Sequence, residues 1–159
     1  MQKVNRIILF FIFLLSSFTL NAKTIPHEIW GITLGSTPET EARKIVESKG
    51  FGYFTKQGDA SVFIGSTVRN CVEFNMLTLS FVNGIVDQIG FGNLYSSSEE
   101  LARSLLVCGP KIQEAYKQYE VPTYDTRSMR FVDGKYFVSI NTSYDGNYHY
   151  LLITYGKTM

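Results

Sequence analysis

Apolar residues recur along the chain with two different periods. Ala42, Ile45 and Val46 fall on one face of a helix within residues 36–50, and residues 97–120 carry a longer apolar face of the same period. The segments between and after them are β-rich runs separated by turn residues. The pattern predicts two helical segments and a larger number of strands.

Each predicted helix begins with a capping-box pattern, in which a Ser precedes a Glu by three residues. Ser36 and Glu39 form the first pair, and Ser97 and Glu100 form the second. Such a pair satisfies backbone amides that have no partner at a helix start. The first helix should end at Gly50, which accepts the left-handed conformation of a helix C-terminus.

The second predicted helix contains Gly109-Pro110. Proline removes one helical hydrogen bond, and its ring presses on the preceding turn. We therefore expect a kinked helix, or two abutting helices, ending near Glu120.

Turn dipeptides separate the predicted strands at regular intervals. The strongest signal is Asn83-Gly84, because both residue types accept the positive φ values of a type I′ turn and apolar runs flank it. Three further hairpins are predicted at Gly58-Asp59, Asp133-Gly134 and Asp145-Gly146. Consecutive hairpins predict an α+β fold with an antiparallel sheet of about seven strands and both helical segments on one face.

The order of elements also suggests an internal repeat. Residues 29–95 and 96–159 each contain a predicted helix followed by a meander of strands, which would be tandem α-βββ halves. Few residues are identical between the halves. An ordinary α+β domain with two helices on one sheet explains the pattern equally well.

Residues 1–22 have the features of a secretory signal peptide, since Lys3 and Arg6 precede an apolar run that ends at Leu20. The alternative is an uncleaved membrane anchor, but the run is shorter than the roughly 20 residues that span a bilayer. No Cys ends the signal, so a lipid anchor is not expected. We expect an exported protein, periplasmic or secreted, whose residues 23–159 form a single α+β domain without a stable membrane span.

Charge argues against a nucleic-acid partner. Cleavage after residue 22 would leave 13 Lys and Arg side chains and 14 Asp and Glu side chains. Steering toward a phosphate backbone needs a clustered excess of positive charge. The mature chain carries no such excess.

Two cysteines, Cys71 and Cys108, form a candidate disulfide in an exported protein. The bridge would close a loop of about 38 residues, which the chain-entropy model values at roughly 4 kcal/mol. The alternative is a pair of buried free thiols that pack as small apolar groups. Spacing alone does not decide between them, because the bridge depends on the separation of the two Cα atoms.

The residues that usually carry chemistry are sparse. His27, His149 and the two cysteines have no metal-ligand spacing, so the sequence assigns no metal, no cofactor and no catalytic residue. A Gly-x-Ser-x-Gly nucleophile motif is also absent. Cys108 lies on a predicted apolar helix face, where burial would raise the pKa of its thiol.

Aromatic residues concentrate in the C-terminal part of the chain. Tyrosine suits a binding surface, because its ring gives a large contact area and its hydroxyl tolerates water. If the helix-free face of the sheet is uncovered, we expect it to display Tyr136, Tyr148 and Tyr150, with His149 beside them. The alternative is that these rings pack in the core.

These features predict a non-catalytic exported binding module that contacts a protein or an envelope component through an aromatic sheet face. Two alternatives stay open. The first is a small-ligand-binding protein or hydrolase with an unrecognised site, which a deep pocket lined by His149 would favour. The second is a structural or oligomerising subunit.

The order of motifs resembles that of uncharacterised small exported proteins of Bacteroidetes. The resemblance rests on the Gly31–Ser36 opening, the Lys49-Gly50-Phe51 helix end and the closing strand 150–155. A weaker likeness links the helix-plus-meander pattern to beta-lactamase inhibitor protein and to outer-membrane-assembly lipoproteins. The chain lacks the lipobox of those lipoproteins. Both resemblances imply an exported α+β protein, and neither assigns a functional residue.

Overall fold

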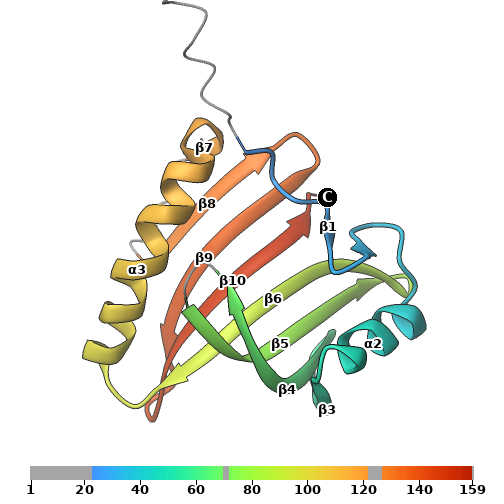
Figure 1. Cartoon of the computed structure of the whole chain (residues 1–159), viewed down its shortest axis with the longest axis horizontal. Helices are drawn as coiled ribbons and strands as arrows, with labels where there is room; N and C mark the ends of the chain where they lie inside the picture. The colour runs from blue at the N-terminus through green and yellow to red at the C-terminus, as the bar shows by residue number, and fades with distance from the viewer. Residues whose placement is uncertain (1–22, 70–71, 122–126, 159) are drawn as a thin grey trace, which may run out of the picture.

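A computed structural model describes residues 23–69, 72–121 and 127–158, and it confirms the α+β class (Figure 1). The predicted signal peptide, 1–22, lies outside the described residues. The main sheet has eight strands in the order β3-β4-β5-β6-β10-β9-β8-β7, and every neighbouring pair is antiparallel. Its strands are β3 (Gly52–Gln57), β4 (Ala60–Arg69), β5 (Val72–Val82), β6 (Ile85–Tyr95), β7 (Glu120–Val121), β8 (Ser128–Asp133), β9 (Tyr136–Tyr144) and β10 (His149–Lys157).

All four predicted hairpins form. Asn83 and Gly84 have φ values of 52° and 74°, as a type I′ turn requires. Gly58 and Gly134 each open a two-residue loop with positive φ at the glycine alone, which is the pattern of a type II′ turn. Gly146, with a φ of 101°, lies in a four-residue loop between β9 and β10.

The two halves of the chain meet in the middle of the sheet. In each half a helix is followed by four strands, and the last strand of each half, β6 or β10, is the innermost (Figure 1). These two strands pair over a register that runs from Tyr95 opposite His149 to Gln88 opposite Gly156. The strand order is thus symmetric about the β6–β10 pair. A tandem repeat would produce this symmetry, although a duplication stays a prediction.

Helices α2 (Glu39–Ser48) and α3 (Ser98–Tyr116) both pack on one face of the sheet. Residues of both helices belong to one hydrophobic cluster with residues of the sheet, as Val46, Cys108 and Phe91 illustrate. We call this the helix side, and we call the other face, which carries no helix, the open face. No helix within the described ranges combines the length and the apolar character needed to cross a bilayer.

The two helix starts differ in how their amides are satisfied. At α3 the Ser97 half of the predicted capping box forms, because the Glu100 amide donates to Ser97 Oγ at 3.3 Å. The Glu100 carboxylate accepts from the hydroxyl and amide of Ser96, and these hydrogen bonds lower its pKa. At α2 the prediction is wrong. The residue before the helix is Pro38, with no side-chain cap, and the Glu39 amide donates to the carbonyl of Gly84 in the β5–β6 turn at 2.9 Å.

Helix α3 continues through Pro110 as one element and is followed by a 3-10 turn, η1 (Lys117–Tyr119). The predicted end near residue 120 is therefore confirmed. Two short strands, β1 (Glu28–Ile29) and β2 (Ile32–Thr33), form a small hairpin that the hydrophobic pattern did not predict. Its turn places Trp30 at a φ of 58°.

Phe91 on β6 is an aromatic centre of the core. Its ring lies 5.4 Å from Trp30 in an edge contact, 6.2 Å from Phe74 and 6.4 Å from Tyr155. The guanidinium of Arg69 lies 4.6 Å from the centre of the same ring. The N-terminal hairpin, β4, β5 and β10 thus converge on one side chain of β6.

Close packing of β4 against Phe51 predicts a stability difference between two glycines. A Cβ at Gly65 would lie 2.6 Å from the Phe51 ring and 2.9 Å from its Cα, whereas a Cβ at Gly52 would meet nothing within 4 Å. Gly65→Ala should therefore lower the free energy of unfolding by about 1–3 kcal/mol. Gly52→Ala is the matched control and should leave it nearly unchanged in urea denaturation. Equal effects of the two changes would contradict the packing seen here.

Candidate functional site

Tyr136 lies on the helix side, not on the open face where the sequence placed it. It packs against the hydrophobic cluster, and its ring lies 5.5 Å from that of His27. The reason is strand alternation. Val138 and Ile140 face the core, so Tyr136, two residues before Val138, faces the same way.

The other predicted residues gather at the β9–β10 turn. Tyr148 is half exposed in the turn, and Tyr150 begins the open-face row of β10, because its neighbour Leu151 is buried in the core. His149 stacks on Tyr144 with their ring centres 4.6 Å apart. Tyr136 and Tyr144 are at opposite ends of β9, about 26 Å apart by the rise of a strand. The four predicted residues therefore do not share one surface.

Asp145 orders this turn. Its carboxylate accepts hydrogen bonds from the Tyr150 hydroxyl and from the amides of Asn147 and Tyr148. The Tyr150 hydrogen bond is the main cause of a lowered pKa at Asp145, and the same bond raises the pKa of Tyr150. The carboxylate is thus engaged by its own turn and does not pair with His149 in the described structure.

The open face is assembled from alternate residues of β5, β6, β10, β9 and β8. One row across it runs through Thr78, Gly90, Thr154, Ser139 and Arg130. The next row, by the same registers, contains Met76, Gly92, Leu152, Asn141 and Ser128. Most of these side chains are small or polar, in contrast to the apolar residues that face the helices.

Glycines on β6 and β10 let neighbouring side chains lie flat on this face. A Cβ at Gly156 would lie 2.5 Å from the Phe137 ring, and a Cβ at Gly92 would lie 2.4 Å from the terminal carbon of Met76. Phe137 is buried although it lies outside the hydrophobic cluster of the helix side. Its ring lies over the backbone of Gly156, so the surface of the open face is low at this place. We call this low surface the floor.

A hollow of about 370 Å³ lies over this floor, and we call it the Arg130 hollow. The Arg130 guanidinium lies 4.2 Å from the centre of the Phe137 ring. Within the described part of the chain, the lining contains one charged side chain and no carboxylate. The hollow is lined by Gln88, Ser128, Met129, Arg130, Phe137, Ser139, Asn141, Leu152 and Thr154.

The sequence reasoning missed this hollow, although one signal was present. Polar Ser139 and Asn141 occupy odd positions of β9, whereas the prediction of a binding face was based on the tyrosines at even positions, such as Tyr136. The odd positions Phe137, Ser139 and Asn141 are the ones that face away from the helices. Deciding between the two sets requires knowing which set meets the helices, and alternation alone does not say.

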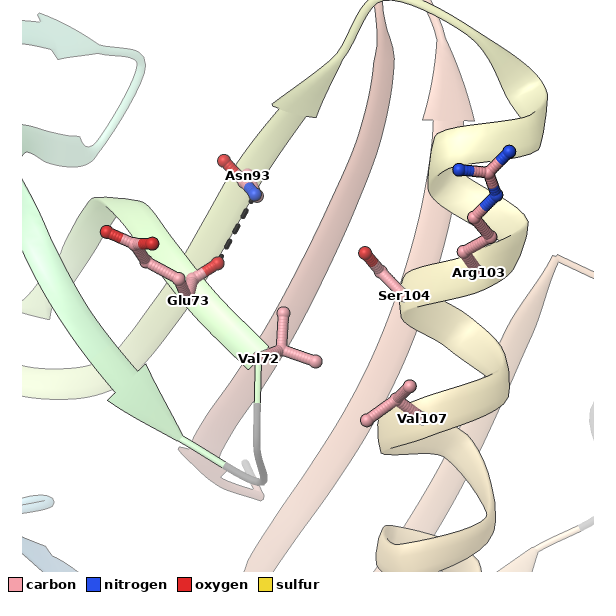
Figure 2. A pocket seen from close by; sticks show the side chains of 6 residues that line it. All are labelled: Val72, Glu73, Asn93, Arg103, Ser104 and Val107. Carbon is pink, nitrogen blue, oxygen red and sulfur yellow. Dashed lines mark hydrogen bonds between the residues drawn. The ribbon is translucent and has the colours of Figure 1, made fainter.

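A second hollow, of about 310 Å³, lies on the helix side between α3 and the start of β5 (Figure 2). Val72 and Val107 face each other across it, and Ser104 points from α3 toward the strands. The side chain of Asn93 donates to the backbone carbonyl of Glu73 at 3.3 Å.

Most polar side chains of this second hollow are engaged within the protein. The Glu73 carboxylate accepts from the Ser66 hydroxyl at 2.6 Å, and Arg103 pairs with Glu99 at 2.6 Å. Ser104 has no histidine beside it in the lining. A nucleophile needs a base within hydrogen-bond reach, so these six residues do not form a catalytic set.

An apolar groove of about 440 Å³ follows the outer side of α3, where Leu106 is 76% exposed. It is lined by Ala102, Leu105, Leu106, Gly109, Pro110, Gln113 and Met129. The groove offers apolar area but almost no hydrogen-bonding group, so it lacks the means to orient a polar ligand. No group of three His, Cys, Asp or Glu side chains within the described ranges could hold a metal ion.

Cys108 is buried on α3, and burial raises the pKa of its thiol. Cys71 lies outside the described residues, so the disulfide stays a prediction. The sequence neighbours of the two cysteines, Val72 and Val107, line the same helix-side hollow.

The buried position of Cys108 predicts slow alkylation in the folded protein. In a Cys71→Ser variant, iodoacetamide at pH 8 should modify Cys108 slowly, because the thiolate is disfavoured and the reagent is excluded. Labelling should become fast in urea, as intact-mass spectrometry would record. Rapid labelling of the folded variant would contradict this burial. Thiol counting on the denatured, unreduced wild type tests the disulfide itself, since a bridge leaves no free thiol.

Comparison of the chain with protein-family models, curated proteins and solved structures gives no match. The resemblance to small exported proteins of Bacteroidetes therefore stays a prediction, and the open face is the feature on which a function is proposed.

Proposed function

We propose that the chain is a non-catalytic exported binding module that contacts a protein or an envelope component through its open face. The observation that supports this most is the Arg130 hollow, which lies over β8, β9, β10 and β6 on the sheet face that carries no helix. An antiparallel sheet commonly leaves one face in solvent, so the feature that distinguishes this face is the hollow with Arg130 beside an aromatic ring.

The composition of the open face fits a contact surface. Protein interfaces are enriched in aromatic residues, Met and Arg, and they are poor in Lys, Glu and Asp. Around the hollow the face presents Arg130, Tyr150 and the amide of Asn141, and no Lys, Glu or Asp lines the hollow. The contact would bury preformed side chains on paired strands, so little conformational entropy is lost on association.

Strand pairing makes the lining of the hollow rigid. Five of the lining residues, from Phe137 to Thr154, belong to β9 and β10, which pair along their whole length. Asn141 donates to the Ser139 hydroxyl at 3.0 Å, which holds its amide over the hollow.

The hydrolase alternative has less support. His149 stacks on Tyr144 and lines none of the hollows described above, and the nearest turn carboxylate, Asp145, is occupied by Tyr150. General base catalysis needs a histidine or carboxylate that can reach a reacting atom.

Site-specific photocross-linking tests the proposal. A benzoylphenylalanine at Asn141 should give a discrete adduct of one mass in cells that produce the full chain. The matched control is the same group at Glu47, an exposed position on α2, which should give no such adduct. Equal adducts from both positions, or none from Asn141, would reject the open face as the contact surface.

A competition experiment adds specificity. Excess unlabelled mature wild type should suppress the Asn141 adduct. Excess Asn141→Trp, in which an indole fills the hollow, should suppress it at least about tenfold less well, because a blocked hot spot costs more than about 1.4 kcal/mol. Thermal denaturation of Asn141→Trp, a half-buried strand position, should match that of the wild type. If Asn141→Trp suppressed the adduct as well as the wild type does, the contact would not involve the hollow.

A further inference from the structure

We infer that Arg130 is the receptor for a carboxylate presented by a partner protein, held in a bidentate hydrogen bond at the edge of the guanidinium. This inference rests on the proposed function, and it specifies the chemistry of the partner group. It is carried by the geometry of Arg130 together with the lining of the hollow.

Contact with the Phe137 ring holds the guanidinium of Arg130 in place. Arg130 lies 4.2 Å above Phe137, and Phe137 is itself held flat over Gly156 by the backbone contact described above. A guanidinium that stacks through its face keeps its N–H groups at the edge, where they match the two oxygens of a carboxylate. The residue is therefore organised before a ligand arrives.

The hydrogen-bonding capacity of Arg130 is not used inside the described protein. Arg43 and Arg103 pair with Glu39 and Glu99 on their own helices, at 2.7 and 2.6 Å. Within the described ranges, Arg130 has a ring contact with Phe137 but no carboxylate partner. A surface arginine that is ordered by stacking and has open donors is a ready anion receptor.

The surroundings favour one negative charge. The hollow adds neutral donors and acceptors from Gln88, Ser139, Asn141 and Thr154, and its lining contains no second cation. The Asp87 carboxylate accepts from the Gln88 side-chain amide at 3.5 Å, but Asp87 does not line the hollow. A carboxylate would be neutralised by Arg130 alone, whereas a phosphate dianion would keep one charge uncompensated.

The area around the hollow favours a protein as the bearer of that carboxylate. Apolar residues extend the open face beyond the hollow, and Leu94 and Ile64 are 41% and 47% exposed there. Nearer to Arg130, Phe137 and Leu152 line the hollow together with neutral polar side chains. An Arg beside apolar and neutral polar side chains is typical of an interface hot spot. A small free acid would leave this apolar margin unused.

Nuclear magnetic resonance titration of the mature chain tests the inference directly. The probes are the capped tripeptide acetyl-Thr-Glu-Thr-amide, its Gln counterpart, and methyl phosphate. The Glu peptide should shift the side-chain resonances of Arg130 and Asn141, with a dissociation constant in the millimolar range. The Gln peptide should leave both unchanged, because it lacks the charge. Arg130→Met should weaken Glu-peptide binding about tenfold, and Arg130→Lys should also weaken it, since an ammonium cannot form the bidentate pair.

Several outcomes would overturn the inference. If the Gln peptide bound as tightly as the Glu peptide, the recognised group would not be a carboxylate. If methyl phosphate bound more tightly than the Glu peptide, the ligand would be a phosphate. Self-association of the wild type that Arg130→Met abolishes in analytical ultracentrifugation would make the partner a second copy of this chain. Full binding by Arg130→Lys would reduce the role of Arg130 to its charge.

The cross-linking experiment separates this inference from the proposed function. If the Asn141 adduct persists at full yield in Arg130→Met, the open face is a contact surface but Arg130 is not its carboxylate receptor. If the adduct is absent from the wild type, the contact surface itself is rejected. A matched thermal denaturation curve for Arg130→Met, an exposed residue, excludes loss of the fold as the cause.

Discussion

The pairing of β6 with β10 is the interaction on which the rest of the structure depends. These strands lie far apart in the chain, yet they are the innermost strands of the two halves and join them into one antiparallel sheet. On the helix side the pair brings Phe91 against Tyr155, and β5, the N-terminal hairpin and Arg69 pack around Phe91. On the open face the same register aligns Gly90 with Thr154 and Gly156 with Gln88. One register therefore sets both the core and the floor of the Arg130 hollow.

The two sides of the sheet differ in how their polar groups are satisfied. On the helix side, Arg103 and Glu73 are engaged by Glu99 and Ser66, and the hollow beside them has no polar group organised for a ligand. On the open face, Arg130 is oriented by an aromatic ring rather than by a carboxylate. Stacking orders a guanidinium without using its hydrogen-bond donors, whereas an ion pair uses them. This difference is the physical reason to place the function on the open face.

The low floor of the hollow comes from residues that contribute almost no side chain. Gly92 and Gly156 allow Met76 and Phe137 to lie against the backbone, where a Cβ would force them outward. Glycine inside a strand ordinarily weakens it, because there is no side chain to pack and more backbone entropy is lost. Here the neighbouring side chains cover the gap, so the sheet stays packed while its outer surface stays flat.

Local patterns in the sequence predicted most of the secondary structure, although not the β1–β2 hairpin. The hairpins at Asn83-Gly84 and Asp133-Gly134 and the Ser97 cap of α3 depend on backbone preferences within a few residues, and they are confirmed, as is the α+β class. What sequence neighbours could not decide is which of two alternating rows on β9 meets the helices. The residues 136, 138 and 140 form one row and 137, 139 and 141 form the other, and both rows contain residues able to pack. The first row faces the core that also contains residues of α3 and Phe91, which are distant in the chain.

The cap of α2 shows the same limit, because its partner, the Gly84 carbonyl, belongs to a turn that is distant in the chain. Arg130, Phe137 and Gln88 likewise come from three strands, and only the register of those strands brings them to one hollow.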